Sequence, residues 1–267
     1  MADVVVAGAA GRMGCRLVAN LQGDKDLRLS AALEAPGHPA VGKDAGEVAG
    51  VGRTGVAITD KAEGALGADR ILIEFSVPEA TLAHLRLVAR DGGRAVIGTT
   101  GLSPAQREEI AGLARQAPIL LSPNMSVAVN VAFHVLRDMA RLLGDEFDVE
   151  VTEIHHRFKK DAPSGTALRM AEVVAEALGR NLADTAVYGR HGLPGERTRQ
   201  EIGIFSLRSG DVVGDHTVSF GTLGERLEIT HRSHNRDNYA RGALRAARFI
   251  SGARPGLYSM QDVLGLG

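Results

Sequence analysis

Short apolar runs alternate with helical segments over roughly the first 125 residues, and this alternation constrains the fold most strongly. Residues 4–7 form an apolar run typical of a buried strand, and Met13, Leu17 and Leu21 recur with the spacing of one helix face. Strands and helices in alternation predict a parallel sheet that is covered on both faces. The expected fold class is α/β, with a Rossmann-like doubly wound parallel sheet. Its further strands are expected at residues 27–34, 56–59, 70–75, 95–98 and 119–122.

Two helices in this region carry clear start and stop signals. One begins at Pro78 and ends at Gly92. The other has Ser103 as its N-cap, Pro104 at its first position, and Gln106 placed to close a capping box. Both helices fit between expected strands, as a doubly wound fold requires.

The pattern changes in the middle of the chain. Helices are expected at residues 127–143 and 166–178, and alternating strands at 148–155, 217–220 and 227–230. These elements predict a central α+β domain with an antiparallel sheet, and a free face of such a sheet is suited to self-association. A helix follows at residues 239–250 and is expected to pack back on the first domain.

Composition argues against several kinds of partner. The formal net charge of −1 gives no large basic field for nucleic acid or an anionic membrane. No run of about eighteen apolar residues is present. Cys15 is the single cysteine, so no internal disulfide can form, and the chain lacks tryptophan for stacking on bases. We expect a cytoplasmic protein with no membrane and no nucleic-acid partner.

A glycine-rich turn joins the first strand to the first helix. Gly8, Gly11 and Gly14 allow a tight turn and close backbone approach to a pyrophosphate, and the helix N-terminus offers unpaired N–H groups. Glu34, twenty residues past Gly14, is placed to accept hydrogen bonds from ribose hydroxyls. The alternative is that the glycines only make a sharp turn. Together these residues favour a dinucleotide.

The residue after Glu34 bears on the choice of dinucleotide. Ala35 supplies no cation that could offset repulsion between Glu34 and a 2′-phosphate, so NADH is favoured over NADPH. Arg12 is the nearby cation that could support NADPH; alternatively, it is solvated or contacts the pyrophosphate. Two loops at the carboxyl ends of later strands, Gly98-Thr99-Thr100 and Ser122-Pro123-Asn124-Met125, are candidates for contact with the nicotinamide end, or serve only as turns.

A compact segment in the central domain carries the candidate chemistry. His155 and His156 can exchange protons near neutral pH, and Lys159 and Lys160 offer positive charge for carboxylates. Ser164 and the two residues after it open a helix and form a second carboxylate site. No metal is expected, because neighbouring strand residues face opposite ways and no cysteine ligands accompany the histidines. The alternative is a basic surface loop capped by Ser164.

These motifs together resemble the dihydrodipicolinate reductase family over essentially the whole chain. The resemblance is carried by the glycine-rich turn, by residues 98–101, 124, 126–130 and 224–231, and above all by residues 153–167, which read E-I-H-H-R-F-K-K-D-A-P-S-G-T-A. It implies NAD(P)H-dependent reduction of 4-hydroxy-tetrahydrodipicolinate to tetrahydrodipicolinate with loss of water, in lysine and diaminopimelate biosynthesis. The implied substrate is a small cyclic dicarboxylate.

The resemblance also implies the domain boundaries and the roles of individual residues. Residues 1–126 and 237–267 would form the dinucleotide-binding domain, and residues 127–236 the substrate-binding domain, through which a homotetramer assembles. The implied catalytic residues are His155 as proton donor and Lys159. The implied substrate-binding residues are His156, Ser164, Gly165 and Thr166. The implied cofactor-binding residues are Gly8, Ala9, Ala10, Gly11, Arg12, Met13, Glu34, Gly98, Thr99, Thr100, Ser122, Pro123, Asn124 and Met125.

Two other functions remain open from the sequence. One is a related NAD(P)H-dependent amino-acid dehydrogenase acting on an open-chain imino or oxo acid, which would share the cofactor domain. The other is a non-catalytic dinucleotide sensor, whose central domain would only mediate self-association. The sensor would bind NADH without turnover and would not depend on His155 or Lys159.

Overall fold

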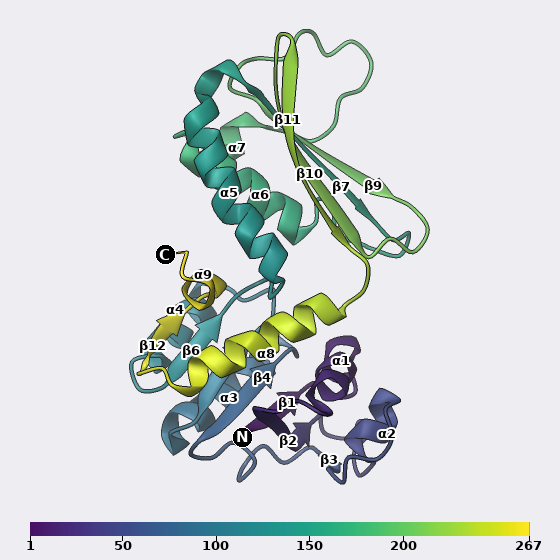
Figure 1. Ribbon diagram of the computed structural model, residues 1–267, viewed down its shortest axis with the longest axis vertical. Coiled ribbons are helices and arrows are strands. Elements are labelled where there is room, and N and C mark those ends of the chain that lie inside the picture. Colours follow the sequence, from purple (N-terminus) through teal and green to yellow (C-terminus); the bar gives the residue numbers. More distant parts are fainter. Residues whose placement is uncertain (267) are drawn as a thin grey trace. The chain divides into compact units, whose positions relative to one another are not determined.

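The computed structural model describes residues 1–266, which form two compact units (Figure 1). The first unit combines residues 1–127 with the chain from residue 236 onward, and the second contains residues 128–235. The first unit is therefore discontinuous in sequence.

A parallel sheet of seven strands forms the centre of the first unit. Its order is β12-β6-β5-β4-β1-β2-β3, so the direction of winding reverses between β1 and β4. Ligands of open parallel sheets bind beyond the carboxyl ends of the strands at such a reversal. The strands are β1 (Ala2–Ala7), β2 (Leu27–Leu33), β3 (Ile58–Thr59), β4 (Arg70–Glu74), β5 (Arg94–Ile97), β6 (Pro118–Leu121) and β12 (Gly256–Tyr258).

Helices cover both faces of this sheet because alternate strand residues are apolar on each side. Val4 and Val6 face a core shared with α1 and α8, whereas Val5 and Ala7 face a core shared with α3 and α4. Arg16 on α1 donates to Asp237 at the start of α8 at 2.5 Å, which joins the two ends of the chain. The helices of this unit are α1 (Arg12–Leu21), α2 (Ala45–Ala49), α3 (Pro78–Asp91), α4 (Pro104–Leu113), α8 (Asp237–Ser251) and α9 (Met260–Leu264).

The second unit has two layers. Its sheet, in the order β11-β10-β7-β9-β8, packs one apolar face on the long helices α5 and α6 (Figure 1). Along β7 buried and half-buried residues alternate, so the other face of the strand is left partly open. The elements are α5 (Val127–Leu143), the short 3₁₀ helix η1 (Gly144–Glu146), β7 (Asp148–His155), α6 (Gly165–Ala177), α7 (Leu182–Thr185), β8 (Ala186–Val187), β9 (Ile202–Arg208), β10 (Gly214–Thr222) and β11 (Glu225–Ser233).

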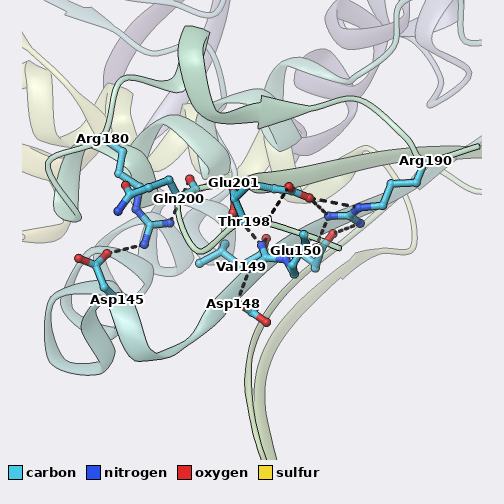
Figure 2. Close-up of polar contacts among 10 residues, drawn as sticks. Asp145, Asp148, Val149, Glu150, Arg180, Arg190, Thr198, Gln200 and Glu201 are labelled. Atoms are coloured by element: carbon cyan, nitrogen blue, oxygen red, sulfur yellow. Dashed lines mark hydrogen bonds and ion pairs between the residues drawn. The ribbon is translucent and has the colours of Figure 1, made fainter. Parts of the chain in front are cut away.

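A long loop at residues 188–201 precedes β9 and is anchored to β7 by ion pairs. Arg190 donates to Glu150 at 2.8 and 3.1 Å and also pairs with Glu201 (Figure 2). Arg197 pairs with Asp148 at the start of the same strand. These contacts hold the loop without any regular secondary structure of its own.

The predicted fold class, a doubly wound α/β sheet with an additional α+β unit, is confirmed. The expected antiparallel pairing holds for β10 with β11 and β7, but the sheet is mixed, because β9 runs parallel to both β7 and β8. A parallel neighbour needs a long crossover, which here passes through α6 and the loop before β9. Within residues 1–266 no helix has the length and apolar character needed to cross a lipid bilayer.

Candidate active site

The glycine-rich turn between β1 and α1 depends on close backbone packing. Gly8 has a φ of +70°, and a β-carbon added to Gly14 would lie 2.1 Å from the carbonyl oxygen of Gly8. A β-carbon on Gly8 would itself meet the carbonyl oxygen of Phe75 at 3.1 Å. Gly11 caps α1 without any side-chain hydrogen bond, so the first N–H groups of the helix are not satisfied by a cap. This turn has the features that an anion-binding cradle needs.

Glu34 lies at the end of β2 and closes onto this turn. Its carboxylate accepts the backbone N–H of Ala10 at 3.0 Å and that of Ala35 at 3.0 Å. An ionised carboxylate has about four lone-pair directions, so Glu34 retains capacity for further donors. Arg12 is exposed at the first turn of α1, and Ala35 is also exposed. Ala9, by contrast, is buried, and its N–H donates to Leu33.

The loop after β5 is packed more tightly than its sequence indicates. A β-carbon on Gly98 would fall 2.2 Å from the ring of Phe75, so packing alone requires glycine there. Thr99 is buried and its hydroxyl pairs with that of Thr81 at 2.9 Å, whereas Thr100 is exposed. Thr100 is therefore the member of this group with a side chain open to a ligand.

The loop after β6 is also partly structural. The Ser122 hydroxyl donates to the carbonyl of Asn124 at 2.9 Å, and Asn124 Oδ1 accepts the N–H of Ser126 at 2.8 Å. Met125 is buried in the core shared with α8, while Pro123 is exposed. The loop thus turns the chain from β6 into α5 and leaves little of Met125 open to a ligand.

A buried carboxylate and imidazole lie together at the end of β7. Glu153 is fully buried, and His155 Nδ1 lies 2.5 Å from Glu153 Oε2. Arg208 on β9 donates to both oxygens of Glu153 at 3.0 Å, and the Ser164 N–H donates at 3.2 Å. Burial would raise the pKa of Glu153, but hydrogen bonds from His155, Ser206 and Arg208 hold it below the usual value.

Three histidines form a row across β7, β10 and β11. The rings of His155 and His216 meet edge-on with centroids 5.1 Å apart, and those of His216 and His231 are 6.2 Å apart. Burial lowers the pKa of His155 in spite of Glu153, and it lowers the pKa of His216 to about 3. Burial also lowers the pKa of His231. His216 is therefore neutral at physiological pH.

The segment after β7 is a turn, so Lys159 and Lys160 do not continue the alternation of that strand. The Lys159 N–H donates to the carbonyl of His156 at 3.1 Å. The Lys159 ammonium donates to both oxygens of Asp161 at 2.9 Å, whereas Lys160 is exposed. This hydrogen bond from Lys159 lowers the pKa of Asp161. The turn itself thus separates the environments of the two lysines.

Residues 164–166 form the start of α6, as expected. Ser164 is buried and caps the helix through its hydroxyl, which accepts the N–H of Ala167 at 3.2 Å and contacts His216 Nε2 at 3.0 Å. Gly165 and Thr166 follow as the first helical residues. The first N–H groups of an α-helix have no intrahelical acceptor, so this end of α6 attracts anions.

The structure brings together some of the predicted residues and adds others. His155 and Ser164 both contact Glu153, and Lys159 acts electrostatically on His155. The predicted set omitted Glu153, Arg208 and His216. The spacing of Glu153 and His155, which places both on one face of a strand, could have indicated the first of these. In the described part of the chain no group of three or more His, Cys, Asp or Glu side chains is arranged to hold a metal ion.

One unit has a doubly wound sheet with a glycine-rich turn at its point of reversal, and the other carries buried acid–base groups. Together these features define a two-domain enzyme of the dinucleotide-fold class. Residues 2–125 match the family described as "Dihydrodipicolinate reductase, N-terminus", and residues 128–264 match "Dihydrodipicolinate reductase, C-terminus". The chain belongs to the dihydrodipicolinate reductase family, which confirms the assignment made from its motifs.

Relatives of known name agree over the full length. The chain is 53% identical over 266 residues to 4-hydroxy-tetrahydrodipicolinate reductase of Citrifermentans bemidjiense and 52% identical to that of Geobacter sulfurreducens, with 100% of each chain covered. Among solved structures, a dipicolinate-bound dihydrodipicolinate reductase from Paenisporosarcina sp. TG-14 has a TM-score of 0.74 at 22% identity, covering 98% of both chains. An amine dehydrogenase from Mycobacterium smegmatis has a TM-score of 0.56 at 18% identity, covering 97% of this chain and 95% of its own. These two structural similarities support the fold alone.

Proposed function

We propose that this chain is a 4-hydroxy-tetrahydrodipicolinate reductase of lysine and diaminopimelate biosynthesis. The observation that carries the proposal is the identity of 53% over the whole length to a reductase of that name. The reaction takes one 4-hydroxy-tetrahydrodipicolinate, one NAD(P)H and one proton to tetrahydrodipicolinate, NAD(P)⁺ and water. The substrate loses water to give a conjugated imine, which then accepts the hydride at a ring carbon.

The glycine-rich turn and Glu34 fit a reduced nicotinamide dinucleotide, which supplies the hydride when bound. Gly8, Gly11 and Gly14 would admit the pyrophosphate, supported by Ala9, Ala10, Arg12 and Met13. Glu34 would accept the ribose hydroxyls, since its carboxylate has lone pairs left beyond the two backbone donors. The loops at residues 98–100 and 122–125 would line the nicotinamide end, with Thr100 as the exposed side chain.

NADH is the favoured cofactor in this proposal. Ala35 is exposed beside Glu34 and offers no positive charge to a 2′-phosphate. Arg16 is paired with Asp237 and is therefore engaged, so Arg12 is the cation of α1 that could support NADPH. The ratio of kcat/KM for the two cofactors measures this preference directly.

His155 would deliver the proton that accompanies hydride addition. A histidine that gives up a proton near neutral pH suits this role, and His155 is held beside a carboxylate that stabilises its charged form. Lys159 would exchange its contact with Asp161 for a carboxylate of the substrate and would stabilise negative charge that develops during the reaction.

The substrate is a dicarboxylate, so a second anion site is required. The start of α6, with Ser164, Gly165 and Thr166, would hold one carboxylate. His156 would assist: its Nδ1 is buried and, within the described residues, has no hydrogen-bond partner. This arrangement gives a role to every predicted catalytic and substrate-binding residue of the 153–167 segment, and it leaves Lys160 without one.

We further propose that the chain works in the cytoplasm as a homotetramer assembled through the open face of the second sheet. That face carries hydroxyl and charged side chains in register across β10 and β11, including a contact between Thr217 and Thr230 at 3.0 Å and one between Ser219 and Glu228 at 2.7 Å. Sedimentation equilibrium tests the assembly, and a monomer at micromolar concentration would exclude it.

The activity is tested by following NADH and NADPH oxidation while the preceding synthase generates the substrate from pyruvate and aspartate semialdehyde. Rapid turnover that requires the synthase is expected. A matched assay with open-chain imino and oxo acids tests the alternative of a related amino-acid dehydrogenase. Cofactor binding without turnover on any substrate would instead identify a dinucleotide sensor.

A further inference from the structure

We propose that Glu153 is a positioning residue for His155. Its carboxylate, held in place by Arg208, fixes the imidazole with a proton on Nδ1 and leaves Nε2 as the atom that delivers the proton to the substrate. The inference rests on the proposed function, in which His155 is the proton donor.

The burial and partners of Glu153 keep it in one position and one charge state. It is fully buried and accepts hydrogen bonds from Arg208 at 3.0 Å on both oxygens and from the Ser164 N–H at 3.2 Å. Because β7 and β9 pair in parallel with His155 opposite Arg208, the guanidinium reaches the carboxylate from the neighbouring strand. An ionised carboxylate is an acceptor only.

The hydrogen bond between Glu153 and His155 selects the tautomer. With Glu153 unable to donate, the bond of 2.5 Å between Oε2 and Nδ1 places the proton on Nδ1. The other nitrogen, Nε2, makes no hydrogen bond within residues 1–266. It lies beside Gly214, where an added β-carbon would be only 2.9 Å away, so any larger residue at this position would crowd Nε2. Nε2 is therefore the ring nitrogen of His155 that is left for a ligand.

The charges around His155 explain why it needs this carboxylate. Lys159 and Arg208 both disfavour the imidazolium form, and the neutral ring of His216 lies edge-on with no compensating charge. Glu153 is the group that opposes them. A general acid must be protonated before it can act, so loss of the Glu153 charge removes the stabilisation of the active form.

The test replaces Glu153 with Gln and uses Glu150→Gln as the matched control. Glu150 lies on the same strand and is also paired with an arginine, Arg190 (Figure 2). Its side-chain ion pairs are with Arg190 and Arg197 and not with His155. We expect Glu153→Gln to lower kcat by about 100-fold or more, with KM changed by less than about threefold, since the wrong tautomer disables an acid–base histidine. Glu150→Gln should change kcat by less than about threefold.

The pH profile separates positioning from a purely structural role. Without the Glu153 carboxylate the imidazolium is less stable, so the alkaline limit of kcat should move to lower pH. Glu150→Gln should leave that limit unchanged. Equal losses in the two variants with an unshifted profile would overturn the proposal.

A measurement on the unsubstituted enzyme keeps the proposal falsifiable if Glu153→Gln does not fold. Nitrogen-15 NMR of the histidine side chains, assigned by comparison with His155→Gln, reports which nitrogen carries the proton when the ring is neutral. The Nδ1–H form is expected, and an Nε2–H form would overturn the proposal. Failure of the proposed function has another signature: an inactive unsubstituted enzyme, or full activity in His155→Gln, whatever the tautomer.

Discussion

Acidification is expected to destabilise the second unit through His216. This side chain is 2% exposed, and its Nε2 forms a hydrogen bond with the Ser164 hydroxyl. Its Nδ1 has no hydrogen-bond partner among the described residues. Burial holds its pKa at about 3, whereas an unfolded chain has the ordinary value of 6.5. The unfolded state therefore binds more protons between these two values, and protonation favours unfolding.

The size of the effect follows from the two pKa values. The contribution of neutral His216 to the free energy of unfolding is fully present above about pH 6.5 and is lost progressively as the pH falls toward 3. Between about pH 7 and about pH 5 the folded form stays neutral while the unfolded form becomes almost fully charged. The free energy of unfolding should then fall by about 2 kcal/mol through His216 alone.

Urea unfolding of the unsubstituted chain and of His216→Gln at the two pH values isolates this contribution. Glutamine can still reach the Ser164 hydroxyl but does not titrate, so its loss of stability on acidification should be smaller by about 2 kcal/mol. His191→Gln, at an exposed loop position, is the matched control and should behave as the unsubstituted chain does. All samples need one protein concentration, since subunit association adds to stability. An equal pH dependence in His216→Gln would refute the reasoning.

Three further changes test other parts of the structure. Gly14→Ala places a β-carbon 2.1 Å from a carbonyl oxygen of the turn and should weaken cofactor binding at least about tenfold by calorimetry. Lys159→Ala should lower kcat about 100-fold with cofactor affinity retained, whereas Lys160→Ala should stay near the unsubstituted rate; a collapse of cofactor affinity would mean that Lys159 is misplaced. Gly242→Ala places a β-carbon 1.7 Å from the Met125 carbonyl oxygen and should cost about 1–3 kcal/mol, seen as a lower Tm; an unchanged Tm would contradict the packing.

The parts of the fold that the sequence predicts well are those governed by local chemistry. The capping box of Ser103 and Gln106 forms as expected at the start of α4. The bounds of α5 and β7 agree with the apolar spacing, which reports directly which face of each element is buried. Pairing between strands is harder to predict, because it depends on residues far apart in the sequence. β9 lies parallel to β7, and β12 has only three residues, so neither partner can be read from a local period.

The same distinction, between local sequence and long-range pairing, applies to the candidate site. His155, Lys159 and the start of α6 lie within one short segment, so their residue types were visible together. Arg208 reaches Glu153 from 55 residues away, through a strand register that only the folded chain defines. In the other direction, Gly98 and Thr99 have loop sequences typical of ligand contact, yet their tight packing against Phe75 and Thr81 is a property of the folded interior.

The discontinuous first unit has a consequence for synthesis on the ribosome. Residues 128–235 emerge as one continuous stretch and can fold around their own core. The first sheet cannot be completed until the C-terminal residues of its unit have been synthesised. Until residues 237–258 leave the exit tunnel, the side of β6 that later pairs with β12 is an open sheet edge, and the apolar residues that α8 later covers are exposed to solvent. The N-terminal part of the nascent chain is therefore prone to aggregate until synthesis is complete. Chaperones that recognise exposed strands should bind it before the chain is released.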